Sequence, residues 1–252
     1  ASSRGWYDAA YGRPTRSLCD DEVLKLTPAA HGRIARRSQD DVFVKTHSRM
    51  GACGGVDLTS GLLTAGAIYI MRNPFDVAVS ASDHFGVPLD AMVEHMCDPE
   101  FRTASDAAHV SEYVGDWAGH VESWAAVPHR RLLVLRYEDL LQAPRREFGR
   151  VCTFLGLRPP AERIDRAIEA SSFKTMQAQE RRTGFKERAP HAQAFFREGR
   201  ADQWRDAFSD DLIARLGAAT ARTMQRFGYL VGAPPAGRDS GVEQACQPTF
   251  SS

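Results

Sequence analysis

Short runs of apolar residues alternate along this chain with stretches whose apolar residues recur at helical spacing. One such run covers residues 68–71, and helical spacing begins at residue 75 and continues to about residue 85. Between them, Asn73 is a favoured N-cap, and Pro74 suits the first helical position, where its missing N–H costs nothing. The pattern therefore predicts a buried strand, a tight turn that carries Arg72, and a helix.

Two more apolar runs predict strands of the same kind. Residues 42–47, with the sequence VFVKTH, and residues 131–136, with the sequence RLLVLR, are both short and nearly continuous. The polar stretch 171–195 predicts a long loop. Helical spacing elsewhere predicts helices at 20–26, 28–37, 89–97, 110–126, 144–155, 161–170 and 210–229. This alternation of apolar strands and helices indicates an α/β protein whose parallel sheet is covered on both faces.

Basic side chains follow two of the predicted strands. Arg72 ends one strand, and Lys45 and His47 end another. In parallel α/β sheets, ligands bind beyond the carboxyl ends of the strands, so these groups predict one anionic ligand held between two strand ends. Ser80, about two turns into the helix, reaches the same anion only if the ligand lies along the first turns of that helix. The alternative is that Arg72 and Lys45 are ordinary solvated charges at strand ends.

Composition narrows the class of protein. The chain has 252 residues, of which 43% are hydrophobic and 25% charged, as expected for one large globular domain with tails. Its 32 basic residues balance its 32 acidic residues, whereas a general nucleic-acid or membrane-surface binder usually shows a basic excess. Any anion site must therefore be local, and neither nucleic acid nor a membrane is expected as a partner.

Hydropathy and cysteine usage predict a cytoplasmic protein. No apolar run approaches the roughly 20 residues that a membrane span needs, and the first residues do not resemble a signal peptide. The 5 cysteines are scattered and form no CxxC pair. They are typical of reduced thiols in a cytosolic protein, so neither a disulfide framework nor a metal site is expected.

Five sequence blocks follow one another between about residues 40 and 230: VFVKTH, IYIMRNPFDVAVS, LVLRYEDL, SSFKTM and FFREGRADQWRDAFS. Each block alone is weak, but in this order and spacing they resemble the cytosolic-type sulfotransferases. These enzymes transfer a sulfuryl group from 3′-phosphoadenosine 5′-phosphosulfate (PAPS) to an acceptor hydroxyl or amine, which leaves 3′-phosphoadenosine 5′-phosphate (PAP). The resemblance implies a three-layer sandwich around a central parallel sheet, similar to the P-loop NTPases.

Carried over residue by residue, the resemblance implies that His47 is the general base and that Lys45 is a cation near the transferring group. Sulfuryl transfer resembles phosphoryl transfer, because it needs an in-line approach and cations on the departing oxygens, with little covalent work for the protein. An imidazole is suited to take the proton of the acceptor near neutral pH. The alternative for His47 is a polar residue that merely ends a strand.

Seven further residues match positions that contact the nucleotide in this family. They are Arg72 and Ser80 at the 3′-phosphate, Tyr137, Ser171 and Phe173 at the adenine, and Arg197 and Gly199 in a late loop that closes over the 3′-phosphate. Arginine suits a phosphate because its planar fork binds two oxygens at once, and an aromatic ring offers a face to the adenine.

One feature of the family is missing from the sequence. In the family, a strand, a loop of the form PKSGTTW and a helix precede the KTH block, and the loop holds the 5′-phosphosulfate through backbone amides and a lysine. Nothing in residues 1–41 resembles this unit, and the sequence begins with Ala1. We therefore expect the chain to begin after the phosphate loop, with a helical segment at 1–37, a sulfotransferase domain at 38–230 and a flexible tail at 231–252.

A second departure is Glu198, which stands where the family usually has lysine or arginine. An acid beside a 3′-phosphate opposes binding unless it points away, so Arg197 and the backbone of Gly199 are the stronger candidates there. The dimer motif of the family is not recognisable in residues 205–215, so that a monomer and a homodimer both remain open.

Other functions stay open beside the leading hypothesis of a PAPS-dependent sulfotransferase. A kinase would have a similar sheet, but the chain has neither a Walker loop nor a set of residues typical of Mg²⁺ binding. The missing phosphate loop leaves room for a catalytically inactive nucleotide-binding or interaction protein. The acceptor is expected to be a small molecule, walled by the loop 48–60, the region 84–107 and the polar stretch before Phe195, with His84 and His95 as candidates.

Overall fold

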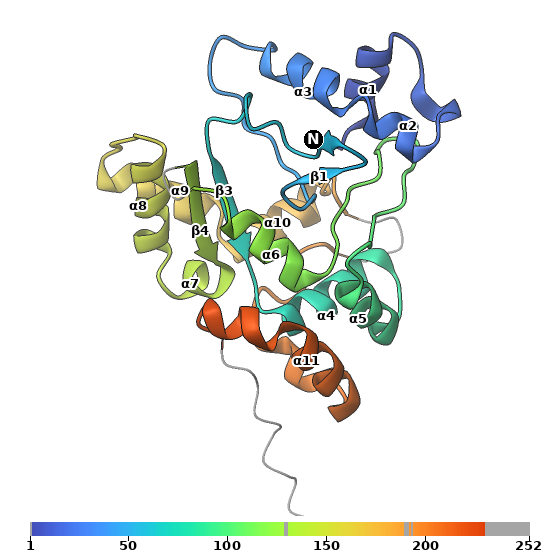
Figure 1. Cartoon of the computed structure of the whole chain (residues 1–252). Helices are drawn as coiled ribbons and strands as arrows, with labels where there is room; N and C mark the ends of the chain where they lie inside the picture. The colour runs from blue at the N-terminus through green and yellow to red at the C-terminus, as the bar shows by residue number, and fades with distance from the viewer. Residues whose placement is uncertain (1, 129–130, 189–191, 193, 230–252) are drawn as a thin grey trace, which may run out of the picture.

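The computed structural model describes residues 2–128, 131–188, 192 and 194–229. At its centre, strands β3 (Ala67–Met71) and β4 (Leu132–Arg136) pair in parallel, with Ala67 opposite Leu132 and Met71 opposite Arg136 (Figure 1). Both strands lie where their apolar runs predicted them, and their parallel pairing agrees with the predicted α/β class.

Each of these strands leads directly into a helix. After β3, helix α4 (Pro74–Phe85) begins as predicted, because the side chain of Asn73 accepts a hydrogen bond from the N–H of Phe75 at 3.0 Å. After β4, helix α7 (Tyr137–Gln142) begins without an intervening loop. The carboxyl ends of the two strands and the first turns of the two helices therefore meet at one edge of the sheet.

Most other helices agree with the sequence pattern to within a few residues. They are α2 (Asp20–Leu24), α3 (Thr27–Ala35), α5 (Leu89–Cys97), α8 (Pro144–Phe154), α9 (Ala161–Ala170) and α11 (Asp210–Arg226). Helix α11 packs on α4, α5 and α6 (Trp117–Ala125). The main core lies between these helices and β3, and it buries the side chains of Phe75, Val93, Val121 and Leu216.

The predicted strand at residues 42–47 is wrong. This segment runs without regular secondary structure among the described residues, and the side chain of Phe43 is 75% exposed. A strand needs a hydrogen-bonded neighbour, and the paired strands β3 and β4 do not extend their ladder to it. Ile70 of β3 is also 56% exposed, so the apolar run at residues 68–71 is not fully buried.

The predicted helix at 110–126 is too long. Gly115 has a φ of 68°, and Asp116 caps α6 by accepting from the N–H of Gly119 at 2.8 Å. The residues before this break are extended: Tyr113 forms an antiparallel bridge with Arg102. Tyr113 and Trp117, which a single helix would place on one face, therefore belong to two different clusters of buried side chains.

The predicted loop at 171–195 is also wrong in its first half. Helix α10 (Phe173–Thr183) begins at Ser172, whose hydroxyl accepts from the N–H of Thr175 at 3.3 Å. Most side chains of this helix are polar, so its sequence has no apolar stripe that would predict a helix. It ends at Gly184, which has a φ of 75°.

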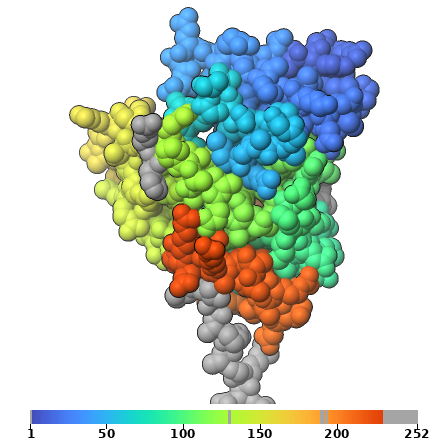
Figure 2. Space-filling view, viewed as in Figure 1, coloured from blue at the N-terminus to red at the C-terminus, as the bar shows by residue number. Residues whose placement is uncertain are grey.

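The first part of the chain forms a layer of its own at one end of the molecule, opposite α11 (Figures 1 and 2). Helix α1 (Arg4–Tyr11) packs on α3, and the buried guanidinium of Arg4 donates to the carbonyl oxygens of Asp106 and His109. A short turn η1 (Thr15–Ser17) and a small hairpin, β1 (Ala52–Cys53) with β2 (Val56–Asp57), complete this end. The predicted tail at 231–252 lies outside the described residues.

None of the helices in the described part of the chain is long and apolar enough to cross a membrane. The described cysteines, Cys19, Cys53, Cys97 and Cys152, are all free thiols.

Candidate functional site

Arg72 lies where the two strand ends meet. Its guanidinium carbon is 4.5 Å from the ring centroid of Tyr137, the first residue of α7, and its terminal nitrogen donates to the carbonyl oxygen of Arg200 at 3.2 Å. The Nε of Arg72 is buried and has no hydrogen-bond partner within the described residues. A buried donor of this kind normally has an acceptor, so one N–H of Arg72 stays unsatisfied among the described residues.

The turn that carries Arg72 is fixed by a carboxylate from the neighbouring strand end. Glu138 accepts from the backbone N–H of Asn73 at 2.9 Å through one oxygen and from the hydroxyl of Tyr229 at 2.9 Å through the other. Burial raises the pKa of Tyr229, which keeps its hydroxyl available as a donor. Glu138 thereby ties the end of β3 to α7 and to the residues after α11.

A second carboxylate, Asp76, holds the late loop, defined here as residues 195–204, beside Arg72. Asp76 lies in the first turn of α4 with 0% of its surface exposed, and it accepts from the N–H groups of Asp202 at 2.8 Å and Trp204 at 3.1 Å. Burial raises the pKa of Asp76, and these two donors oppose that rise. The start of α4 and the late loop are therefore one structural unit.

The late loop also reaches further along α4. The Nε of Arg197 lies 2.5 Å from a carboxylate oxygen of Asp83. Ser80 precedes Asp83 by three residues, so the two lie on the same face of α4, one turn apart. Arg72 thus directly precedes the N-cap of α4, Ser80 lies on this helix, and Arg197 contacts its last turn.

Helix α10 supports the late loop from the other side. Glu180 is buried and accepts from the N–H groups of Phe195 at 2.7 Å and Phe196 at 3.0 Å. Burial by itself raises the pKa of Glu180, but these two donors hold it below its ordinary value. At the start of the same helix, the ring of Phe173 packs so closely on Gly199 that a Cβ there would lie 2.2 Å from Cδ2.

Glu198, the departure from the family pattern, has a partner of its own. Its carboxylate accepts from the Nε of Arg200 at 2.7 Å, and Arg200 also pairs with Asp206 at 3.0 Å. The acid is therefore part of an ion-pair cluster in the late loop.

Lys45 and His47 form a second group. The Nζ of Lys45 lies 2.5 Å from a carboxylate oxygen of Glu187, and the hydrogen bond from Lys45 lowers the pKa of that carboxyl group, with smaller contributions from the neighbouring His47 and His84. The backbone N–H of His47 donates to Glu112 at 2.8 Å, while its imidazole is exposed. Although the segment is no strand, it brings Lys45 and His47 together, with His84 of α4 nearby.

Ser171 is not brought into contact with these groups. Its hydroxyl donates to the carbonyl oxygen of Ala167 at 2.8 Å, at the end of its own helix α9. Of the candidate acceptor residues, His84 lies 6.1 Å from the ring of Phe195, and His95 stacks on Phe101 at 4.6 Å.

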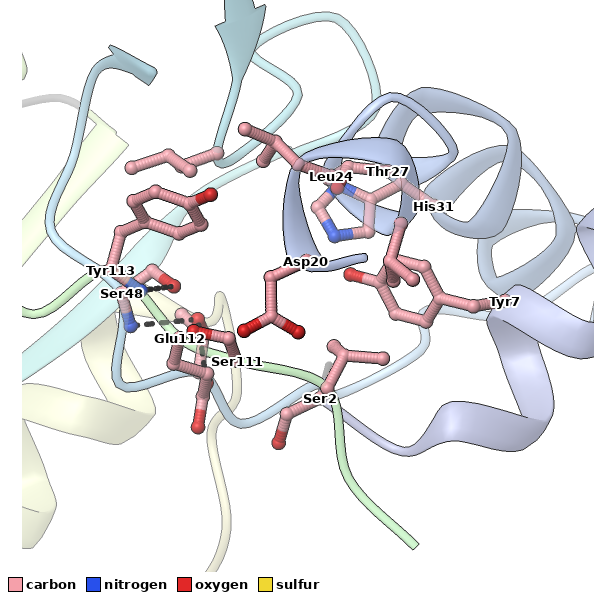
Figure 3. A pocket seen from close by; sticks show the side chains of 14 residues that line it. Ser2, Tyr7, Asp20, Leu24, Thr27, His31, Ser48, Ser111, Glu112 and Tyr113 are labelled. Carbon is pink, nitrogen blue, oxygen red and sulfur yellow. Dashed lines mark hydrogen bonds between the residues drawn. The ribbon is translucent and has the colours of Figure 1, made fainter. Parts of the chain in front are cut away.

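A small pocket lies between the N-terminal helices and the segments 46–48 and 110–113 (Figure 3). The carboxylate of Asp20 and the hydroxyl of Tyr7 point into it, and His31 faces them with a pKa that burial lowers. Its volume of about 30 Å³ suffices for one or two water molecules and not for an acceptor. Thr46 belongs to its wall, so this pocket lies behind the segment that carries His47.

Within the part of the chain that the structure describes, no group of three or more His, Cys, Asp or Glu side chains is placed to hold a metal ion. Sequence reasoning missed the carboxylates of Asp76, Glu138, Glu180 and Glu187. The local signal is the position of Asp76 and Glu138 in the first turns of α4 and α7, whereas the partners of all four carboxylates lie at least 15 residues away in the sequence.

The fold and these contacts define an α/β protein with a cationic cluster at the carboxyl ends of two parallel strands. A family model described as Sulfotransferase domain matches residues 59–228. Sulfotransferase 1A1 of Canis lupus familiaris is 28% identical over 217 residues, which cover 82% of this chain and 66% of that protein. This chain therefore belongs to the sulfotransferase-domain family.

Two solved structures are similar in fold. Retinol dehydratase in complex with androsterone and the inactive cofactor PAP matches with a TM-score of 0.59 and 22% identity, over 87% of this chain and 64% of that chain. Mouse sulfotransferase SULT7A1 complexed with PAP matches with a TM-score of 0.53 and 20% identity, over 68% of this chain and 62% of that chain. The chain spans between about half and two thirds of the length of the curated relatives it matches.

Proposed function

We propose that this protein transfers a sulfuryl group from PAPS to a hydroxyl or amine of a small-molecule acceptor. The observation that carries the proposal is the environment of Arg72: a buried Nε for which the described residues supply no partner, a guanidinium stacked on Tyr137, and a position where two parallel strands end. Membership of the sulfotransferase-domain family supports the same reaction. PAP and androsterone in the related retinol dehydratase structure support a nucleotide of this kind and a small acceptor.

The residues around α4 fit a 3′-phosphate. Arg72, just before α4, supplies the unsatisfied donor, and Ser80 on α4 supplies a neutral donor. Arg197 adds a second guanidinium, already oriented by Asp83, and the backbone of Gly199 lies two residues further on in the late loop. Two guanidinium groups and a hydroxyl are the donor set that a doubly charged phosphate prefers.

Aromatic rings fit the adenine. Tyr137 stands at the first position of α7, and its ring is ordered by the guanidinium of Arg72. Phe173 stands at the first position of α10, against Gly199. We assign Ser171, two residues before Phe173, to the rim of the adenine site. To reach the adenine, its hydroxyl must give up the hydrogen bond to the carbonyl oxygen of Ala167.

When bound, PAPS supplies the sulfuryl group and its PAP moiety is the leaving group. The exposed imidazole of His47 takes the proton of the acceptor, because the segment 42–47 presents it outward from the molecule. Lys45 stabilises negative charge that develops on the departing oxygens, as cations do in phosphoryl transfer. To do so, its ammonium group exchanges the carboxylate of Glu187 for the anion.

The test is transfer of ³⁵S-labelled sulfate from PAPS to 2-naphthol, measured with the wild-type chain, with His47→Ala, and with His109→Ala as a matched control on an exposed histidine. We expect transfer by the wild type and the control, and a loss of about 10²- to 10⁴-fold for His47→Ala, as is typical of a lost general base. Equal rates for His47→Ala and the wild type would overturn the assignment of the base.

Binding of PAP, measured separately by calorimetry, distinguishes the remaining alternative. A chain that binds PAP and transfers nothing to any of a panel of phenols, steroids and amines would be a nucleotide-binding module. A chain that neither binds PAP nor transfers would contradict the proposal entirely.

A further inference from the structure

Helix α6 holds the main chain around His47 from one side. The Nε2 of His120 donates to the carbonyl oxygen of His47 at 3.1 Å, and four residues later the indole N–H of Trp124 donates to the carbonyl oxygen of Ser48 at 3.2 Å. Residues four apart lie one above the other on a helix, so one face of α6 contacts two successive peptide groups. Glu112 holds the N–H of His47 from a different segment.

His120 is in turn fixed by the central sheet. The hydroxyl of Tyr69 lies 2.9 Å from the Nδ1 of His120, and the two rings are stacked with centroids 5.7 Å apart. Tyr69 also stacks on Trp124 at 6.0 Å. Because Tyr69 belongs to β3, three residues before Arg72, a continuous path of contacts connects the strand that carries Arg72 with the main chain of His47.

The hydrogen bonds define one protonation state along this path. A carbonyl oxygen only accepts, so the Nε2 of His120 carries a proton, and the Nδ1 of a neutral ring then accepts from the hydroxyl of Tyr69. Burial lowers the pKa of His120 and raises the pKa of Tyr69, so both groups are neutral near pH 7. The ring is therefore locked by one donor and one acceptor at fixed positions.

We propose that His120 is a positioning residue that sets the main chain of His47 and so aims the imidazole of His47 at the acceptor. This inference rests on the proposed role of His47 as the general base. The segment 42–47 has no strand ladder to fix it, so bonds at the N–H and the carbonyl oxygen of His47 do what a sheet would otherwise do. His120 supplies the bond to the carbonyl oxygen. Because His120 also contacts Tyr69, it links the position of His47 to strand β3.

The experiment compares two substitutions that differ in one donor. His120→Gln keeps an N–H that reaches the carbonyl oxygen of His47, whereas His120→Leu removes it. Tyr69→Phe removes only the hydroxyl that fixes the ring, and His109→Leu is the matched control for the loss of a histidine. Each variant is checked for its melting temperature before kcat and KM for PAPS are measured with 2-naphthol.

We expect kcat for His120→Leu to fall by about tenfold to a hundredfold, since small displacements of a catalytic group have effects of this size, while KM for PAPS stays within about twofold. We expect His120→Gln to recover most of the lost rate and Tyr69→Phe to fall between the two. Equal kcat for His120→Leu and the wild type, or equal losses in the Leu and Gln variants, would overturn the proposal.

A readout that does not need activity separates this inference from the proposed function. In amide hydrogen exchange, we expect residues 47–50 to exchange faster in His120→Leu than in the wild type and in His120→Gln. If the wild type transfers no sulfuryl group, the proposed function fails, and His120 then has no catalytic base to position. The exchange data still decide whether His120 anchors the main chain of residues 47–50. Unchanged exchange in His120→Leu would contradict the anchor itself.

Discussion

Two cationic segments of this chain are built in opposite ways. The turn after β3, which carries Arg72, leads directly into its own helix: Asn73, the next residue, caps α4, and Asp76 is buried in the first turn. The segment 42–47, which carries Lys45 and His47, has an exposed Phe43 and no strand partner among the described residues. Its contacts at His47 come from residues more than 60 positions away in the sequence.

This difference shows where local sequence determines a binding group and where it does not. A strand and an N-cap within a few residues specify the turn that carries Arg72, and Glu138 and Arg200 then hold this turn from further along the chain. The position of His47 depends on the correct packing of α6 and of the segment 110–113. We therefore expect substitutions around Arg72 to change stability or binding strongly. Substitutions at the apolar positions of the segment 42–47 should change the stability little.

The largest effect is expected for Asp76→Ala. The change leaves the buried N–H groups of Asp202 and Trp204 without an acceptor, at a cost of about 3 kcal/mol in the free energy of unfolding. Urea titration measures it, and Asp206→Ala, two residues after the late loop, where the side chain is largely exposed, is the control that should leave stability unchanged. A loss for Asp76→Ala no greater than that of the control would contradict the role given to this carboxylate.

A smaller effect, on binding rather than on stability, is expected for Arg72→Lys. Lysine keeps the charge but loses the planar group that stacks on Tyr137 and the Nε that lacks a partner. We expect the affinity for PAP to weaken by about tenfold or more in calorimetry, because a bidentate site is not satisfied by a point charge. Arg222→Lys, on the exposed face of α11, is the matched control, and equal affinity in both variants would remove Arg72 from the site.

The smallest effect is expected for Phe43→Ser. With 75% of its surface exposed, Phe43 buries little apolar area, so the free energy of unfolding should change by less than about 0.5 kcal/mol. The same urea titration measures it, with Asp76→Ala as the positive control. A loss of several kcal/mol would show that the segment is covered by a contact absent from this structure, and the comparison between the two regions would then fail.

The sequence predicted those parts of the fold whose signals are local. Apolar runs located β3 and β4, and Asn73 with Pro74 located the start of α4. Hydrophobic spacing could not reveal α10, because its surface is mostly polar, and it extended α6 across Gly115, where the chain turns with a φ of 68°. In both cases the deciding information is a single cap or a single glycine.

For the candidate site, the sequence indicated the cations and not their partners. Arg72 and Tyr137 meet because two parallel strands end together, which the α/β pattern implied. The pairing of Lys45 with Glu187 and of Arg197 with Asp83 could not be inferred, since each joins residues more than 100 positions apart.

Gly199 has a consequence for how such a protein can change over time. It has a φ of 61°, and no room remains between its Cα and the ring of Phe173. A larger side chain at either position requires a smaller one, or a shifted backbone, at the other. Substitutions at positions 173 and 199 are therefore expected to occur together. A larger ring at position 173 alone would displace residue 199 and the late loop around it, so the start of α10 and the late loop constrain each other.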